Sequence, residues 1–223
     1  MRVIGVDGCH GGWVAVALRD GTFESAVAAV HISEILSRHD GAEAVGIDIP
    51  IGAERGRFRR VDAAARELLR PRSSTLFQTP PLEVLACSDF PSALALCREL
   101  TGKGFSKQSH GLRERMLEVD AIAKRDRRII EVHPELSFRA MAGGRPLEKK
   151  KSWNGACERK SLLEEAGIRL PADLGRAGEA AGVDDVLDAA AAAWTANRFA
   201  LGMAESLQPV VRDVNGRDIT IWY

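Results

Sequence analysis

The stretch RVIGVDGCHGGWVAVAL, residues 2–18, decides the fold. An apolar run leads into Asp7, a glycine-rich turn follows, and a second apolar run begins. This pattern predicts two strands, residues 3–7 and 13–18, joined by a tight hairpin, because glycine tolerates the positive φ of tight turns. A carboxylate at the end of a buried strand costs several kcal/mol unless it is paired or binds a metal. Asp7 is therefore the first candidate functional residue.

Further strands extend this hairpin into an α/β sheet. Residues 22–30 alternate loosely in polarity, which predicts a third strand and an antiparallel meander. Ser33 is expected to cap a short helix. The mostly apolar run EAVGIDIPIG, residues 43–52, predicts a central parallel strand reached through a helical crossover. The run RRIIEVHPELSF, residues 127–138, predicts another strand that ends at His133.

The rest of the chain predicts helices around this sheet. We expect one domain over residues 1–223, with residues 53–126 forming a mainly helical, basic insertion. Helical patterns also cover residues 157–167 and the alanine-rich residues 183–207, and residues 218–223 are expected to form a last strand or a packed tail.

Acidic residues recur where the predicted strands end. Equivalent ends of adjacent parallel strands lie side by side, and a helix beginning nearby converges on them. Several carboxylates within a few ångströms cannot all ionise without a cation, and oxygen ligands favour Mg²⁺ or Mn²⁺. The predicted metal ligands are Asp7, Asp48, Asp185 and Asp188, with Glu131 at the margin. Taken singly, each of the four aspartates also fits a turn-capping or helix-start role.

Composition indicates a cellular location but no binding partner. The 31 Lys and Arg balance 31 Asp and Glu, so the net charge indicates no particular partner. The chain opens on a strand without a signal-peptide pattern, and no apolar run reaches the roughly 18 residues of a membrane span. The four cysteines are scattered, which is typical of free thiols in a reducing compartment. A cytoplasmic location is expected.

Basic residues of the insertion are candidates for substrate binding. Guanidinium forks and hydroxyls suit phosphate oxygens, and glycines near a lysine let backbone amides approach an anion. A solvated helix face explains the arginines equally well, and the lysine run of residues 149–151 has the same two readings. The predicted substrate-binding residues are Arg59, Arg60, Arg72, Ser73, Ser74, Lys103, Lys107, Gln108 and His133.

Several motifs resemble the ribonuclease H-like superfamily, and within it the Holliday-junction resolvases. They are GVDGCHGGWVAVAL, GIDIPIG and DDVLDAAAAAW, and EVHPELSF followed by KKK is similar to a resolvase E-x-x-P strand and lysine-bearing helix start. With RPRSS, GKGFSKQ, EVD and the terminal IWY, the whole chain resembles domain-of-unknown-function family 429, described as predicted nucleases. The resemblance implies a ribonuclease H-like mixed sheet flanked by helices. It also implies that Asp7, Asp48 and the pair Asp185 and Asp188 hold the metal.

The leading hypothesis is a metal-dependent nuclease that hydrolyses phosphodiester bonds in DNA or RNA. Two ions about 4 Å apart would activate a water and stabilise the leaving oxygen. One alternative is a non-catalytic nucleic-acid-binding or scaffolding module on the same fold. Another is an ATP-phosphate-binding protein of the sugar-kinase and actin type, which shares the first-strand GxDxG hairpin. The oligomeric state stays open, with a homodimer as one option.

Overall fold

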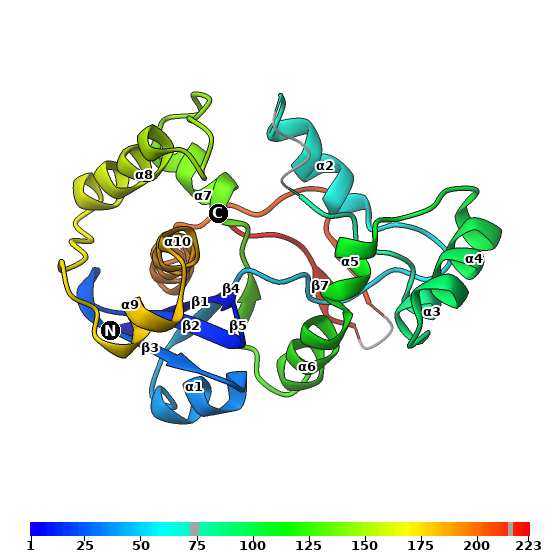
Figure 1. The fold of residues 1–223 in the computed structure, drawn as a ribbon, viewed down its shortest axis with the longest axis horizontal. Coiled ribbons are helices and arrows are strands. Elements are labelled where there is room, and N and C mark those ends of the chain that lie inside the picture. The colour runs from blue at the N-terminus through cyan, green and yellow to red at the C-terminus, as the bar shows by residue number, and fades with distance from the viewer. Residues whose placement is uncertain (72–75, 214–215) are drawn as a thin grey trace. The chain divides into compact units, whose positions relative to one another are not determined.

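The computed structural model describes residues 1–71, 76–213 and 216–223. It divides the chain into two compact units, both visible in Figure 1. The first unit comprises Met1–Ile49, Arg127–Glu205 and Trp222–Tyr223, and the second comprises Pro50–Asp126 and Ser206–Ile221. Among the described residues, no helix has both the length and the apolar character needed to cross a membrane.

The first unit is built on a five-stranded mixed sheet with strand order β3-β2-β1-β4-β5. β1 pairs antiparallel with β2, and β2 with β3, whereas β1 pairs parallel with β4, and β4 with β5. The predicted combination of an antiparallel meander and parallel strands is confirmed. The strands are β1 (Arg2–Cys9), β2 (Gly12–Arg19), β3 (Thr22–Ala29), β4 (Ala44–Ile47) and β5 (Ile129–Glu131).

The first hairpin is longer than the sequence suggests. Pairing of β1 with β2 continues past Asp7 to Cys9 opposite Gly12, so a two-residue turn of His10 and Gly11 joins the strands. Gly11 has a φ of 77°, which explains why glycine stands there. Asp7 therefore lies inside β1, two residues before its end, and not at the strand end that the pattern predicts.

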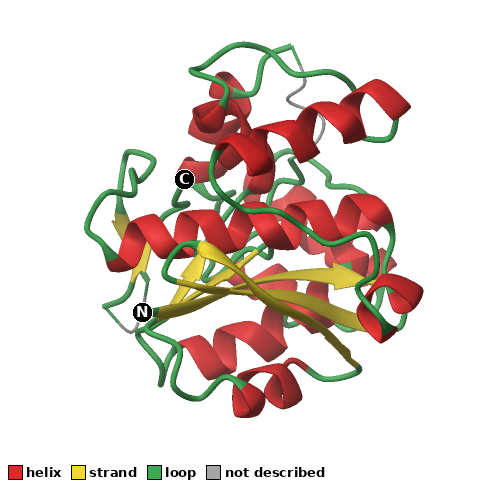
Figure 2. Ribbon diagram, turned by 90° about the vertical axis from the view of Figure 1, so that its left-hand side faces the viewer, coloured by secondary structure: helices red, strands yellow, loops and turns green. Residues whose placement is uncertain are grey.

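Helices cover both faces of this sheet, as Figure 2 shows. The prediction that Ser33 caps the first helix is wrong. The helix begins two residues earlier than a Ser33 cap implies, with His31 as the N-cap residue, and the backbone N–H of His31 donates to the Glu34 carboxylate at 3.2 Å. The helices are α1 (Ile32–Arg38), α7 (Pro134–Met141), α8 (Trp153–Glu165), α9 (Arg176–Ala180) and α10 (Val183–Ala200).

Helix α10 lies unusually close to the centre of the sheet. A Cβ atom at Gly5 would stand 2.0 Å from the backbone nitrogen of Ala193, and one at Gly46 would stand 2.6 Å from the carbonyl oxygen of Ala192. The alanines of the helix, residues 189–193, are fully buried. Small residues on both sides thus let two backbones meet. This close approach brings the first turns of α10 to the ends of β1 and β4.

The second unit is mainly helical and contains the predicted insertion together with residues 206–221. A small apolar cluster of Val84, Ala93 and Cys97 packs inside it. Its elements are α2 (Arg60–Leu68), α3 (Leu82–Leu85), α4 (Phe90–Thr101), α5 (Lys107–Gly111), α6 (Arg113–Ala123), β6 (Val211–Arg212) and β7 (Asp218–Ile219).

The end of the chain differs from the prediction in two places. The long helix stops at Ala200, before the expected residue 207, because Gly202 adopts a φ of 70° and its N–H bonds back to the carbonyl of Phe199. The expected last strand is split. Its start pairs with β6, whereas Trp222 donates its backbone N–H to the carbonyl of Glu131 at 2.9 Å.

The close approach of α10 makes a direct test of this packing. We expect Gly5→Ala to lower the free energy of unfolding by about 3 kcal/mol, because the added methyl group forces the helix away from β1. Gly41→Ala is the matched control, since a Cβ atom at Gly41 meets nothing within 4 Å. Urea denaturation of both variants measures the difference. Equal stability of the two variants would contradict the packing described here.

Candidate metal centre

The first two carboxylates come from neighbouring parallel strands. Gly5 pairs with Gly46 and Val6 pairs with Ile47, and the N–H of Asp48 continues this ladder by donating to the carbonyl of Val6 at 2.9 Å. Asp7 and Asp48 are therefore side by side. Because side chains alternate along a strand, both point to the face of Gly5 and Gly46, which is the face that α10 covers.

The third carboxylate comes from the helix. Asp188 lies on α10 immediately before the buried alanines, and it is only 2% exposed. Each of Asp7, Asp48 and Asp188 offers a carboxylate oxygen, and the three oxygens lie within 4.8 Å of one another. This cluster, called the carboxylate triad below, can hold a metal ion. The acidic metal cluster that the sequence predicts at this sheet edge thus has three of its five members in place.

Burial makes the triad electrostatically expensive. Desolvation, followed by the neighbouring carboxylates of Asp48 and Asp188, raises the pKa of Asp7 well above its usual value. Burial and Asp188 do the same to the pKa of Asp48. Burial raises the pKa of Asp188 to about 6, although Lys150 acts against the rise. At neutral pH the folded protein therefore either retains protons on this cluster or binds cations there.

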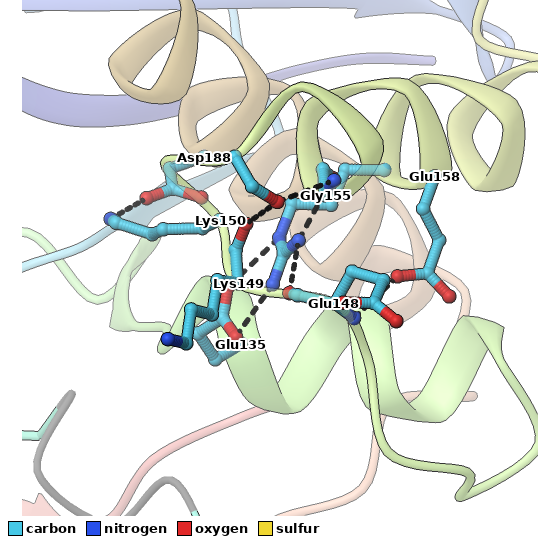
Figure 3. A network of polar contacts seen from close by, with 9 residues as sticks. Glu135, Glu148, Lys149, Lys150, Gly155, Glu158 and Asp188 are labelled. Atoms are coloured by element: carbon cyan, nitrogen blue, oxygen red, sulfur yellow. Dashed lines mark hydrogen bonds and ion pairs between the residues drawn. The ribbon is translucent and has the colours of Figure 1, made fainter.

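A lysine already supplies one positive charge. The Nζ atom of Lys150 lies 2.7 Å from Oδ2 of Asp188, as Figure 3 shows. Burial lowers the pKa of Lys150, but the charges of Asp188, Asp48 and Asp7 outweigh burial and raise that pKa above its ordinary value. The ammonium group is thus firmly protonated. The sequence placed this lysine in a basic run without assigning it to the carboxylates.

A second buried ion pair fixes the segment that carries Lys150. Arg159 on α8 donates from Nε and Nη2 to the two carboxylate oxygens of Glu135 on α7, at 2.9 and 2.8 Å. Its Nη1 atom donates to the carbonyl oxygens of Glu148 and Gly155, at 3.1 and 2.9 Å. One guanidinium group thereby joins α7, α8 and the turn before Lys150. Nothing in the local sequence pattern indicates this pair, whose members are 24 residues apart.

Two predicted ligands lie outside the triad. Oδ2 of Asp185 accepts the backbone N–H of Gly182 at 3.1 Å, which is the helix-start role considered above. Glu131 is paired in register with Ile47, so it points to the opposite sheet face from Asp48. Its charge nevertheless adds to the raised pKa of Asp48, after burial and Asp188. Of the described residues, neither belongs to the group whose ligand atoms converge.

His133 is the N-cap residue of α7, and the charge of Lys150 acts on its imidazole ring. Burial, and next the positive charge of Lys150, lower the pKa of His133 to about 4, so its imidazole is neutral at physiological pH. Within the described part of the chain its Nδ1 atom has no hydrogen-bond partner. A neutral imidazole can donate one hydrogen bond and accept another, and the substrate-binding role of His133 stays a prediction.

The other predicted substrate-binding residues belong to the second unit. Arg59 is buried there, and its Nη2 atom lies 2.5 Å from Oδ1 of Asp62, so its guanidinium group is committed to the interior. Arg60 is half exposed and pairs with Glu54 at 3.1 Å. Lys103, Lys107 and Gln108 are exposed. Arg72, Ser73 and Ser74 lie outside the described residues. Phosphate binding stays a prediction for every member of this group except Arg59, whose buried guanidinium group argues against it.

A family model described as "Protein of unknown function (DUF429)" matches residues 5–212. No curated protein and no solved structure matches the chain. The match covers all three residues of the carboxylate triad, because Asp7, Asp48 and Asp188 lie between residues 5 and 212.

The cost of the triad predicts an unusual gain in stability. We expect Asp7→Asn to raise the free energy of unfolding in metal-free buffer at pH 7 by about 1 kcal/mol, because it removes a buried charge. The asparagine oxygen can still accept the N–H of Gly8, which lies 2.6 Å from Oδ1 of Asp7. Asp184→Asn, on α10 but outside the triad, is the control and should bring no gain. Thermal unfolding in EDTA measures both, and a destabilised Asp7→Asn variant would contradict the electrostatic account.

Metal binding should depend on pH with a definite sign. Protons and a cation compete for carboxylates whose pKa values are raised, so the increase in Tm caused by Mg²⁺ should be small at pH 5 and grow as the pH rises through about 6. Without metal, stability should fall over the same range, because the folded state retains protons that the unfolded chain has released. Differential scanning calorimetry at pH 5 and at a pH above 6, with and without Mg²⁺, measures these changes. A Mg²⁺ effect that is larger at pH 5 would contradict this prediction.

Proposed function

We propose that this chain, which belongs to the DUF429 family, is a divalent-cation-dependent nuclease that hydrolyses phosphodiester bonds. The observation that carries the proposal is the carboxylate triad, in which two buried aspartates and the partly buried Asp48 bring ligand oxygens within 4.8 Å of one another. The mixed sheet of the first unit, an antiparallel meander followed by parallel strands, also supports the resemblance of the sequence to ribonuclease H-like proteins. The family itself contributes no activity, so the chemistry rests on the site.

The donor set fits Mg²⁺ or Mn²⁺. Carboxylate oxygens are hard ligands that suit these ions, whereas zinc sites mostly include histidine or cysteine. Charge agrees with this choice. Three ionised aspartates carry −3 and Lys150 carries +1, which leaves −2 for one divalent cation to cancel. Asp7, Asp48 and Asp188 would hold the ion.

Each group around the triad has a separate task in hydrolysis. A bound divalent cation supplies Lewis acidity toward a phosphoryl oxygen and lowers the pKa of water. Lys150 provides a fixed positive charge beside Asp188, where a phosphate oxygen gains a charge-assisted hydrogen bond. The pair of Glu135 and Arg159 positions the turn that carries Lys150. Asp185 contributes negative potential, since its charge adds to the raised pKa of Asp7.

The cost of the triad argues against the non-catalytic alternative. Apolar or neutral residues at these positions would stabilise the fold, so a purely structural role gives no reason for three buried acids. The ATP-binding alternative calls for a duplicated domain with a second phosphate loop. The described residues contain one copy of the five-stranded sheet. Phosphodiester hydrolysis accounts for the triad with the fewest additional parts.

The proposal predicts loss of cleavage without loss of fold. Asp7→Asn and Asp188→Asn should each reduce Mg²⁺-dependent cleavage of DNA and RNA substrates by at least about 100-fold, because an interaction with the reacting centre is lost. Gel analysis of labelled oligonucleotides measures this. Asp184→Asn is the matched control and should cleave like the wild type. Cleavage by Asp7→Asn at the wild-type rate, or cleavage that EDTA does not stop, would contradict the proposal.

A further inference from the structure

One aromatic side chain near the triad is exposed to an unusual degree. Trp153 is the first residue of α8, and 82% of it is accessible to solvent, more than any other large hydrophobic residue that the structure describes. Tryptophan is mostly buried in folded proteins, because it has the largest apolar surface to remove from water. An indole ring kept in solvent therefore calls for a binding partner.

The ring is carried by a rigid turn. The Ser152 hydroxyl accepts the N–H of Gly155 at 3.1 Å and donates to the carbonyl of Lys149 at 2.7 Å, contacts that Figure 3 displays around Gly155 and Lys149. A Cβ atom at Gly155 would lie only 2.0 Å from that carbonyl oxygen, so glycine is required for the approach. The guanidinium of Arg159 holds the carbonyl of Glu148 in the same turn. The backbone on both sides of Trp153 is thus held by hydrogen bonds.

The same turn connects the ring to the triad. Lys150, which contacts Asp188, precedes Trp153 by three residues, so their Cα atoms are at most about 11 Å apart. Lys149 and Lys151 on either side of Lys150 are exposed. The charge of Lys151 also acts on the pKa of Asp185, after burial and the Gly182 hydrogen bond, which places it near the start of α10. An exposed ring and two exposed lysines thus flank, in the same short turn, the lysine that contacts the triad.

We propose that Trp153 stacks on an unpaired base of the substrate strand while Lys149 and Lys151 contact the phosphates beside it. This inference rests on the proposed nuclease function and names its substrate class as single-stranded or locally unpaired nucleic acid. Aromatic platforms flanked by cations bind such strands because every base has a π-face and every linkage carries a charge. Duplex nucleic acid hides these faces. The sequence neighbours Lys151, Ser152 and Asn154 are polar, a composition that suits a nucleic-acid strand better than an apolar protein partner.

Binding without cleavage tests the inference. In EDTA, Trp153→Ala should weaken the binding of a fluorescein-labelled single-stranded oligonucleotide about 10-fold, as measured by anisotropy, whereas Trp153→Phe should retain most of the affinity. Separate DNA and RNA oligonucleotides show which sugar the site prefers. Met203→Ala, which alters another exposed side chain of the first unit, is the control. A duplex that contains the same oligonucleotide should bind wild type and Trp153→Ala equally. Unchanged melting temperatures of the variants verify that they fold.

The outcomes separate this inference from the nuclease proposal. If Trp153→Ala binds the single strand as tightly as wild type, the stacking inference is wrong even when Asp7→Asn abolishes cleavage. An equal loss for single strand and duplex also overturns it. If Trp153→Ala loses single-strand affinity selectively while no metal-dependent cleavage is found, stacking is supported and hydrolysis is wrong.

Discussion

Mutual repulsion among the three carboxylates of the triad, two of them buried and one partly buried, is the constraint on which the rest of the first unit depends. Asp7 and Asp48 are adjacent because β1 and β4 are parallel and in register. Asp188 joins them because Gly5 and Gly46 let α10 lie directly on the strands. Burial, and next the neighbouring carboxylates, raise the pKa of Asp7 and the pKa of Asp48. The sheet and the helix must therefore be stable enough to tolerate a cluster that opposes folding.

Lys150 relieves part of this repulsion, and a second charged pair holds Lys150 in position. The bidentate contact between Arg159 and Glu135 is itself buried, and its guanidinium reaches two further carbonyl oxygens. The turn of residues 148–152 is thus held by Arg159 at Glu148 and by the contact between Lys150 and Asp188. It carries the ammonium group toward the triad and the indole ring toward solvent. A charged network with so many satisfied donors gives a defined geometry more than it gives stability.

Part of this arrangement follows from the sequence, and the reasons are physical. Apolar runs that contain a single aspartate predict β1 and β4. They also mark Asp7 and Asp48 as candidate ligands, because a carboxylate in an otherwise apolar strand needs a partner. The helix start of α10 offered Asp185 and Asp188 equally. Only packing of the alanine face against the sheet selects Asp188. Glu131, which the sequence offered only as a marginal ligand, lies on the other face of the sheet because it pairs in register with Ile47. Lys150 and Arg159 act through tertiary contacts that no local pattern encodes.

The most direct test of the account is a crystal structure of the protein soaked in Mn²⁺, with anomalous diffraction recorded at the manganese edge. The account predicts an anomalous peak among the carboxylates of Asp7, Asp48 and Asp188, bound by oxygen atoms alone. A soaked crystal with no anomalous peak at the triad, and with Lys150 still paired to Asp188, would contradict the claim that these three acids form a metal centre.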